Sequence, residues 1–309
     1  MNKTLIFGHK SPDTDSICSA LIMEDLEKHF NKGNDVATAC RLGEINKETA
    51  YALNYFKVDA PKLIETVEDG AEVILVDHNE FSQSVNNIEN AKIMKVMDHH
   101  RISNFQTAEP LFYMAQPVGC TATILHEVYK LNNYEIKPHI AGLMLSAIIS
   151  DTLLLKSPTT TIKDIKAVEE LAKIAGVNYN NYGLDMLKAG TDLSGYSAEE
   201  LINIDAKCVD MNGNKVKVAQ VNTVDIKDVL KNQAEIETAI NNTIANENLD
   251  LFVFAITDIV NSNSEAVVLG KRTDIFEKAF NAKLENNRAF LPGVVSRKKQ
   301  ILPVMQENT

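Results

Sequence analysis

The sequence predicts an α/β protein in which an N-terminal, mostly parallel sheet flanked by helices precedes a smaller C-terminal domain of mixed α/β structure. Three observations support this fold class. Short apolar runs alternate with helical patterns over the first half of the chain, which indicates crossover units and parallel strand pairing. A stretch containing glycine and serine interrupts this alternation near residue 190. Beyond it, an Asn-Gly pair between two strand patterns indicates a β-hairpin.

The elements of the first domain follow from hydrophobic patterning. Compact apolar runs such as TLIF and EVILV are typical of strands, whereas apolar residues at helical spacing indicate amphipathic helices. Strands are predicted at residues 4–7, 35–41, 72–76, 91–97 and 112–115. Helices are predicted at residues 18–30, 46–56, 119–131, 138–150 and 162–174.

The chain changes character between residues 188 and 201. Glycine and serine become frequent there, and Ser197 with Glu200 forms a capping pattern that opens a new element. We therefore predict two domains, residues 1–188 and 197–309, joined by a linker at residues 189–196.

The second domain shows fewer and more mixed elements. Strands are predicted at residues 206–209, 215–221, 251–260 and 265–270, and the Asn-Gly pair lies between the first two. Helices are predicted at residues 224–246 and 274–280. A basic run, SRKKQ, follows at residues 296–300 near the C-terminal end, and its apolar flanks indicate an ordered segment rather than a loose tail.

Length and charge limit the classes of protein that the chain can represent. It has 309 residues, more than one hydrophobic core usually serves, so two domains are the default expectation. It carries 42 acidic against 31 Lys and Arg residues, a formal charge of −11 and a pI of about 5.2. Because affinity for nucleic acid depends mainly on Lys and Arg, we expect no nucleic-acid partner. A small, locally basic site for an anion remains compatible with this balance.

Hydropathy and cysteine usage indicate a cytoplasmic location. No segment approaches the roughly 20 consecutive apolar residues that span a bilayer, so no membrane partner is expected. The first residues, MNKTLIFGHK, lead directly into a strand pattern and show no signal-peptide features. The four cysteines form no CxxC pair and are predicted to be buried, reduced thiols. They are Cys18, Cys40, Cys120 and Cys208.

Aspartate and histidine cluster at four places where a predicted strand or helix ends. The turn GHKSPDTDS at residues 8–16 carries one imidazole and two carboxylates. DHN follows the strand at 72–76, DHH follows the strand at 91–97, and Asp-Thr follows the helix at 138–150. A single Asp of this kind is usually a cap or turn residue, and a single buried His is usually just hydrogen-bonded. Four such clusters at one predicted sheet favour a functional site instead.

The donor atoms in these clusters indicate hard divalent ions. Carboxylate oxygens and imidazole nitrogens, with no thiolate among them, suit Mn²⁺, Co²⁺, Mg²⁺ or Fe²⁺. One ion does not use so many ligands, whereas two ions roughly 3.5–4 Å apart, sharing one bridging aspartate, do. The sequence contains neither GxGxxG nor a Walker-type loop, so a nucleotide cofactor is not expected.

Together, these motifs resemble the family II inorganic pyrophosphatases, the manganese-dependent branch of the DHH phosphoesterase superfamily. The resemblance rests on GHKSPDTDS, on DHN at residues 77–79, on DHH at 98–100, on Asp-Thr at 151–152 and on SRKKQ. It covers essentially the whole chain, and the combination of DHH with SRKKQ in a second domain is its distinctive part. It implies a DHH-type first domain, hydrolysis of pyrophosphate to two phosphates, and a homodimer formed through the first domain.

The resemblance also implies roles for individual residues. The implied metal ligands are His9, Asp13, Asp15, Asp77, His99 and Asp151. One ion would take His9 and Asp13, the other would take Asp15, His99 and Asp151, and Asp77 would bridge them. His100 would face the substrate, Lys207, Arg297 and Lys298 would bind its phosphate groups, and these four residues with Asp13 would be the catalytic positions. The implied cofactors are two Mn²⁺ per subunit, replaceable by Co²⁺, with a further Mg²⁺ accompanying the substrate.

General chemistry is compatible with each of these roles. A water held between two divalent ions loses a proton near neutral pH and becomes a nucleophile. Arg297 offers a planar fork to two phosphate oxygens, while a lysine acts as a point charge. His100, with an ordinary pKa of about 6.5, can donate a hydrogen bond or a proton to the leaving oxygen. With metals in the first domain and cations in the second, closure would assemble the site in an interdomain cleft.

Alternatives to these interpretations remain open on the sequence alone. A short basic run is usually solvated, but apolar LPGVV and ILPV flank SRKKQ and favour a function for Arg297 and Lys298, whereas Lys299 stays undecided. Lys207 fits the outer face of a strand equally well. A DHH phosphoesterase acting on short oligonucleotides, cyclic dinucleotides or a nucleotide 3′-phosphate would carry a glycine-rich motif in the second domain. A non-catalytic sensor of metal or phosphate would show a gap among the ligands or a regulatory insertion.

Overall fold

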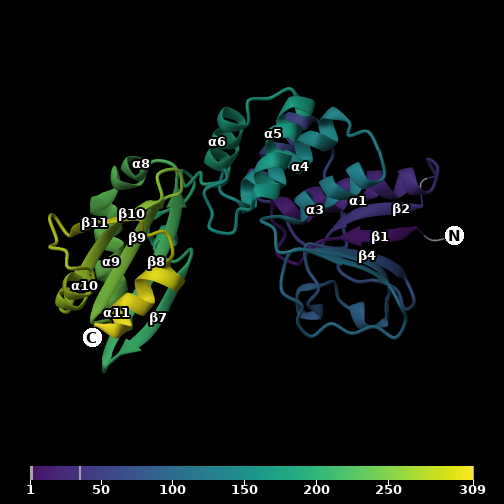
Figure 1. Cartoon of the computed structure of the whole chain (residues 1–309). Coiled ribbons are helices and arrows are strands. Elements are labelled where there is room, and N and C mark those ends of the chain that lie inside the picture. The colour runs from purple at the N-terminus through teal and green to yellow at the C-terminus, as the bar shows by residue number, and fades with distance from the viewer. Residues whose placement is uncertain (1–2, 35, 309) are drawn as a thin grey trace. The chain divides into compact units, whose positions relative to one another are not determined.

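The computed structural model describes residues 3–34 and 36–308 of the chain. They form two compact units, Met1–Gly190 and Thr191–Thr309, which we call unit 1 and unit 2 (Figure 1). Within the described residues, no helix combines the length and the apolar character needed to cross a membrane.

Unit 1 is built on a six-stranded sheet with parallel pairing throughout. Its strands are β1 (Thr4–Phe7), β2 (Ala37–Arg41), β3 (Lys62–Leu63), β4 (Glu72–Val76), β5 (Lys92–Asp98) and β6 (Phe112–Ala115). They lie in the order β3-β2-β1-β4-β5-β6. The predicted parallel sheet is therefore confirmed. Residue 35 of the predicted second strand lies outside the described residues, and the two-residue strand β3 was not predicted.

The helices of unit 1 begin and end close to the predicted positions, with two informative differences. They are α1 (Thr14–Phe30), α2 (Lys47–Phe56), α3 (Thr121–Leu131), α4 (Pro138–Asp151), α5 (Ile162–Ala175) and α6 (Tyr179–Gly190). Helix α1 begins at Thr14 rather than at residue 18, because the Asp13 carboxylate accepts the backbone N–H of Ser16 and caps the first turn. Helix α6 was not predicted, and it includes the first two residues of the predicted linker.

Side chains of the sheet in unit 1 alternate between two cores. Ile6 and Ile74 belong to a core that residues of α1, α3 and α4 complete. Phe7 and Leu75, one residue further along each strand, belong to a second core that loop residues such as Val85 complete. Because β1 and β4 are buried on both faces, their polar residues are confined to the strand ends.

Unit 2 contains a five-stranded mixed sheet. Its strands are β7 (Ala206–Met211), β8 (Asn214–Thr223), β9 (Leu251–Asp258), β10 (Asn263–Gly270) and β11 (Arg288–Pro292), in the order β11-β10-β9-β8-β7. Strands β8 and β9 pair in parallel and the other neighbours pair antiparallel, which confirms the predicted mixed α/β domain. The predicted hairpin is present, with Asn212 at φ 50° and Gly213 at φ 81°, both in the left-handed region that this tight turn requires.

The helices of unit 2 cover both faces of its sheet. They are α7 (Ala198–Leu201), α8 (Ile226–Leu230), α9 (Gln233–Glu247), α10 (Thr273–Phe280) and α11 (Leu302–Glu307). The Ser197–Glu200 capping box is formed as predicted. The single helix predicted at 224–246 is two helices, because the N–H of Asn232 bonds to the carbonyl of Val229 and ends α8 in a tight turn.

The predictions at the C-terminal end were incomplete. Strand β11 and helix α11 were not predicted. The basic run SRKKQ is ordered, as its apolar flanks predict, since most of it forms a single π-helical turn, Arg297–Ile301, directly before α11. Ile301 and Met305 anchor this region in the core of unit 2.

Candidate metal centre

Three neighbouring strands deliver polar side chains to one edge of the sheet in unit 1. Strands β1, β4 and β5 lie side by side and run in parallel, so their carboxyl ends meet at the same edge. His9 comes two residues after β1, Asp77 comes directly after β4, and His99 comes directly after β5. The sheet topology therefore brings together residues that lie far apart in the sequence.

Two helix ends add carboxylates to this edge. Asp13 caps α1 and Asp15 lies in its first turn, whereas Asp151 is the last residue of α4. Helices α1 and α4 pack against each other in unit 1 (Figure 1). Donor atoms of Asp15 and Asp151 lie within 4.8 Å of one another.

Asp77 lies at the middle of the cluster. Its Oδ2 is 3.5 Å from Nε2 of His9, and its Oδ1 is 3.3 Å from Nε2 of His99. The two oxygens of one carboxylate thus face two different imidazoles. His9 Nε2 is also 3.4 Å from the carboxylate of Asp13, and His99 Nε2 is 3.8 Å from that of Asp151. Two groups of donor atoms therefore meet at Asp77.

All six residues predicted as metal ligands occur in compact donor groups. Each group holds one donor atom per residue, and these atoms lie within 4.8 Å of one another. The groups are His9, Asp13 and Asp77; Asp77, His99 and His100; and Asp15, Cys120 and Asp151. The structure thus places His100 and Cys120 beside the predicted ligands.

Hydrogen bonds hold Asp77 in place. Ser16 Oγ donates to its Oδ2 at 2.9 Å, and Thr121 Oγ1 donates to its Oδ1 at 3.2 Å. The backbone of Asp77 has φ 59°, in the left-handed region that non-glycine residues rarely adopt. This turn directs the carboxylate across the ends of the neighbouring strands. A residue in such a conformation is usually retained where the surroundings enforce it, as at functional sites.

Asp15 is held by backbone donors at the start of α3. The N–H of Thr121 donates to its Oδ2 at 2.7 Å, and the N–H of Ala122 donates to its Oδ1 at 3.3 Å. The hydroxyl of Ser19 adds a bond of 2.6 Å. A carboxylate at a helix N-terminus is favoured by the helix dipole. Asp15 is fully buried, and this ring of donors fixes the position of its carboxylate.

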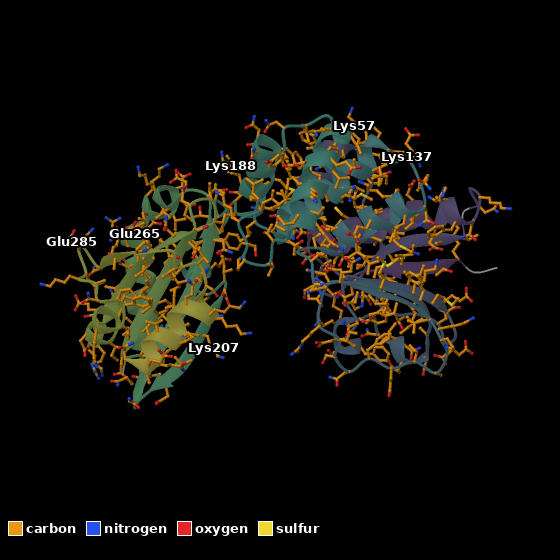
Figure 2. The ribbon with its side chains drawn as sticks, in the orientation of Figure 1. Lys57, Lys137, Lys188, Lys207, Glu265 and Glu285 are labelled. Atoms are coloured by element: carbon orange, nitrogen blue, oxygen red, sulfur yellow. The ribbon has the colours of Figure 1, made fainter. Side chains whose placement is uncertain are left out.

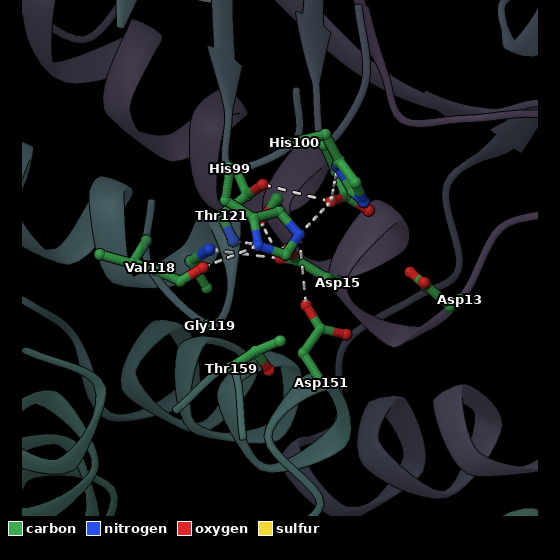
Figure 3. Close-up of polar contacts among 12 residues, drawn as sticks. Asp13, Asp15, His99, His100, Val118, Gly119, Thr121, Asp151 and Thr159 are labelled. Atoms are coloured by element: carbon green, nitrogen blue, oxygen red, sulfur yellow. Dashed lines mark hydrogen bonds and ion pairs between the residues drawn. The ribbon is translucent and has the colours of Figure 1, made fainter. Parts of the chain in front are cut away.

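The two histidines of the DHH motif are oriented by partners on their other ring nitrogens. Nδ1 of His99 lies 3.1 Å from the carbonyl oxygen of Val118, which makes Nδ1 the protonated nitrogen and leaves Nε2 as a lone-pair donor. In Figure 3 the ring of His99 lies between Val118 and Asp151. A ring oriented in this way is typical of a metal-binding histidine.

His100 is held by Asp98, the first residue of the motif. Its Nδ1 lies 2.9 Å from Oδ1 of Asp98, whose other oxygen accepts the side-chain amide of Asn79 at 2.6 Å. Because Nδ1 is engaged, Nε2 is the ring nitrogen that is left for a further partner. The His100 side chain is 51% exposed, compared with 15% for His99. The structure therefore separates the more buried imidazole of the pair from the accessible one.

Burial makes the uncompensated carboxylates of this edge unfavourable. It raises the pKa of Asp77 well above its ordinary value, and the charges of Asp15 and Asp13 raise it further. Burial likewise raises the pKa of Asp151, with Asp15 and Asp77 as the next causes. A cation bound among these groups removes the repulsion between them. The electrostatics of the edge therefore match a cation site.

The donor chemistry fits manganese. Four carboxylates and two or three imidazoles provide oxygen and nitrogen ligands, which suit Mn²⁺, Co²⁺ or Mg²⁺. Cys120 belongs to one of the donor groups, but burial raises the pKa of its thiol well above the ordinary value, so the sulfur keeps its proton at neutral pH. His78, directly after Asp77, bonds instead to the Val76 carbonyl and to Ser84, and burial lowers its pKa to about 4. Both ring nitrogens of His78 are thus engaged in supporting the turn.

The predicted phosphate-binding cations all belong to unit 2. Lys207 lies on the edge strand β7, where it is exposed (Figure 2). Arg297 and Lys298 lie in the turn before α11, and Lys298 is exposed. The guanidinium of Arg297 donates to both oxygens of Asp205, at 2.7 and 3.2 Å. Lys299 is exposed as well, and its backbone N–H bonds to Ser296.

Gln220 on β8 holds the backbone of this basic turn. Its side-chain oxygen accepts the N–H of Arg297 at 2.6 Å, and its side-chain nitrogen donates to the carbonyl of Val295 at 3.0 Å. The basic run is therefore part of the ordered structure of unit 2, although its lysine side chains reach solvent.

Several residues of the site escaped the sequence analysis. Ser16, Thr121 and Asn79 hold ligands or their partners by hydrogen bonds, and Asp98 orients His100. Ser16, Asn79 and Asp98 lie inside the quoted motifs, so their positions were visible but their partners were not. Thr121 lies outside every motif. The start of a helix after Gly-Cys was its only signal in the sequence.

Comparisons with known proteins agree with this geometry. Residues 3–148 match the family model described as DHH family, N-terminal domain, and residues 184–308 match the DHHA2 domain. A protein of Exiguobacterium sp. assigned to the manganese-dependent inorganic pyrophosphatases is 60% identical over 308 residues, which cover 99% of both chains. The manganese-dependent inorganic pyrophosphatase of Bacillus subtilis is 57% identical over 308 residues, with the same coverage.

A solved structure extends the likeness to three dimensions. It is that of a Methanococcus jannaschii protein assigned to the family II inorganic pyrophosphatases, which is 43% identical to this chain. The match has a TM-score of 0.66 and covers 100% of this chain and 99% of the other.

Proposed function

The chain belongs to the family of manganese-dependent inorganic pyrophosphatases, and from this premise we propose that it hydrolyses inorganic pyrophosphate to two phosphates at the metal centre of unit 1. Relatives that align with 99% of the chain are named for this activity. The residue roles and the number of ions proposed below go beyond the family assignment.

One observation carries the proposal of two ions. The two oxygens of Asp77 face different histidines, His9 at 3.5 Å and His99 at 3.3 Å. Each histidine has a second carboxylate beside it, Asp13 for His9 and Asp151 for His99. A carboxylate shared between two such groups is the arrangement expected of a bridging ligand.

We assign the ions to these two groups. The first ion takes His9 and Asp13, the second takes Asp15, His99 and Asp151, and Asp77 is shared. Two Mn²⁺ ions held by these residues would lower the pKa of a bound water so that it could act as the nucleophile near neutral pH. Co²⁺ offers the same ligand preferences, and a further Mg²⁺ is proposed to enter with the substrate.

The protein groups then position the substrate. In its imidazolium form, His100 donates its Nε2–H to an oxygen of pyrophosphate while its Nδ1–H donates to Asp98. Lys207, Arg297 and Lys298 are proposed to neutralise the phosphate groups as charge develops on the leaving oxygen. Asp13 holds its ion from the N-cap of α1, where the Ser16 N–H fixes it at 2.9 Å.

A metal-dependence assay tests the proposed function. Chain stripped with a chelator is expected to release no phosphate from pyrophosphate, and Mn²⁺ is expected to restore release more effectively than Mg²⁺. A dinucleotide and a nitrophenyl phosphate ester assayed in parallel separate this activity from that of other DHH phosphoesterases. Faster cleavage of either of these than of pyrophosphate would contradict the proposal.

We also propose a homodimer formed through unit 1. Strand β6 is at the edge of the sheet and is largely exposed, whereas β5 lies between β4 and β6 and has no free edge. An exposed edge strand pairs readily with a second chain. Analytical ultracentrifugation tests this state.

We also propose a cytoplasmic location. The free thiols of all four cysteines support a reducing compartment such as the cytoplasm.

A further inference from the structure

Glu48, on α2, joins two of the segments that carry metal ligands. Its Oε1 accepts the hydroxyl of Thr14 at 2.8 Å and also accepts the hydroxyl of Ser150. Thr14 lies between Asp13 and Asp15 in the chain, and Ser150 directly precedes Asp151. A single oxygen atom thus links the start of α1 to the end of α4.

The surroundings of Glu48 keep it in this position. Thr14 is fully buried, and its hydroxyl also lies 3.1 Å from that of the buried Thr49. Gly190, the last residue of α6, packs so closely that a Cβ there would lie 2.8 Å from Cβ of Glu48. Burial raises the pKa of Glu48, although the hydrogen bonds from Ser150 and Thr14 oppose this shift. Burial alone therefore disfavours a carboxylate at this position, and the two hydroxyl donors compensate for that cost.

We propose that Glu48 is a positioning residue of the metal centre, which fixes the start of α1 against the end of α4 so that Asp15 and Asp151 converge on one ion. The inference rests on the proposed ligand assignment. It is needed physically because the carboxylates of the site repel one another, and this repulsion tends to separate the two helix ends. Two hydrogen bonds to a charged acceptor counter that tendency, since such bonds are stronger than neutral ones.

The two proposed ions depend on this link to different degrees. The second ion takes ligands from both α1 and α4, namely Asp15 and Asp151. The first ion would take its own ligands, His9 and Asp13, from the loop between β1 and α1, which does not involve α4. Loss of Glu48 should therefore weaken the second ion more than the first.

The same two helices carry a second polar link at their opposite ends, and it serves as a control. Asp25 on α1 accepts the ammonium of Lys137, the N-cap of α4, at 2.6 Å. Its other oxygen accepts the hydroxyl of Tyr129 on α3 at 2.9 Å. Asp25 therefore ties the same helix pair together, far along α1 from the metal ligands. A purely structural tie and a positioning tie can thus be compared within one protein.

The experiment compares Glu48→Ala, Glu48→Gln and Asp25→Asn with the natural full-length chain. Each metal-free protein is titrated with Mn²⁺, with free Mn²⁺ read by electron paramagnetic resonance, and each is melted with and without Mn²⁺. Removing a residue that orients a metal ligand typically costs about 10–100-fold in metal affinity. We expect that loss for one of the two ions in Glu48→Ala, and a smaller loss in Glu48→Gln, which keeps the acceptor oxygen. Asp25→Asn should lower the melting temperature and leave both affinities unchanged.

The outcomes separate this inference from the proposed function. If the natural chain binds fewer than two Mn²⁺, the ligand assignment fails irrespective of Glu48. If the natural chain binds two and Glu48→Ala binds both as tightly, Glu48 does not position the site. Equal weakening in Asp25→Asn would also overturn the inference, since it would show a general effect of stability. Should Glu48→Ala not fold, Ser150→Ala removes one of the two hydrogen bonds, and undiminished binding of both ions there would refute the inference.

Discussion

The cluster of carboxylates in unit 1 (the anionic centre) and the basic residues of unit 2 (Lys207 and the turn that holds Arg297 and Lys298, here called the cationic turn) differ in sign of charge and in burial. Asp77 is 1% exposed and lies among other carboxylates, and both its burial and these charges raise its pKa, so its charged form is unfavourable until a cation binds. Lys207 and Lys298 are exposed, where a charge is well solvated and needs no partner. This difference fits the proposed roles, in which the first region retains ions and the second binds and releases a substrate.

The two regions also differ in how their charged groups are held. Asp77 is fixed by hydroxyl donors and a left-handed backbone, so its oxygens are preorganised. The side chain of Arg297 is held by Asp205, and its backbone N–H is held by Gln220. Lys298 follows in the same turn, and its side chain is exposed. We expect substitutions in unit 1 to act on metal binding and substitutions in unit 2 to act on kinetics alone.

The largest effect should follow from Asp77→Ala, which tests the anionic side of the comparison. Both ions lose their shared ligand, so we expect a loss of Mn²⁺ affinity larger than the roughly 10–100-fold that removal of an orienting residue causes. Phosphate release from pyrophosphate should fall to the background rate. Metal analysis that shows two Mn²⁺ retained per chain would contradict the bridging role.

Lys298→Ala tests the cationic side. Removal of one group that stabilises developing charge typically lowers kcat by about 10²–10³-fold. We expect a decrease of that order in kcat/KM for pyrophosphate, with Mn²⁺ binding unchanged. Lys283→Ala, which removes an exposed lysine elsewhere in unit 2, is the matched control and should retain the natural rate. Kinetics equal to those of the control would remove Lys298 from the site.

The pH dependence of metal binding sharpens the comparison further. Burial raises the folded-state pKa of Asp77 and Asp151, so the metal-free fold retains protons there and loses stability as pH rises through those values. Mn²⁺ requires ionised carboxylates, so its binding releases protons and strengthens with pH. The increase in melting temperature caused by Mn²⁺ should be larger at roughly pH 8 than at roughly pH 6. Equal increases at both pH values would disagree with this account.

The smallest effect is expected at Asp205, the partner of Arg297. The Asp205 side chain is 55% exposed and that of Arg297 is 12% exposed, so water screens the carboxylate and we expect the ion pair to contribute about 1 kcal/mol or less. Asp205→Ala should therefore lower the melting temperature by no more than about 4 °C. A much larger decrease, measured by circular dichroism, would show that the cationic turn depends on its ion pair as strongly as the anionic centre depends on metal.

The fold was predictable where local patterns coincide with tertiary packing. Glu72–Val76 and Phe112–Ala115 have the predicted bounds, the first because its apolar run is buried on both faces of the sheet. Helix α6 was missed because asparagines and Gly183 weaken its pattern, and its stability comes from contacts with α2 and α4. Strand β11 was missed because it is defined by its antiparallel pairing with β10 rather than by its own sequence.

The residues of the site likewise fall into those that the sequence could predict and those that it could not. Its candidate ligands could be named because each follows a strand or lies at a helix end within a motif, and parallel strands meet at one edge. The roles of Thr121, Asp98 and Glu48 could not be predicted, because each depends on a contact with a residue distant in the chain or on a side-chain orientation. Spacing in the sequence does not encode such contacts.

The central claim, that Asp77 is shared by two ions, is tested most directly by electron paramagnetic resonance of the full-length chain loaded with Mn²⁺. Two ions bridged by one carboxylate lie roughly 3.5–4 Å apart, close enough for their spins to couple. We expect two Mn²⁺ per chain with a spin-coupled spectrum, and loss of that coupling in Asp77→Asn. Two uncoupled Mn²⁺ signals, or a single ion per chain in an active protein, would contradict the account.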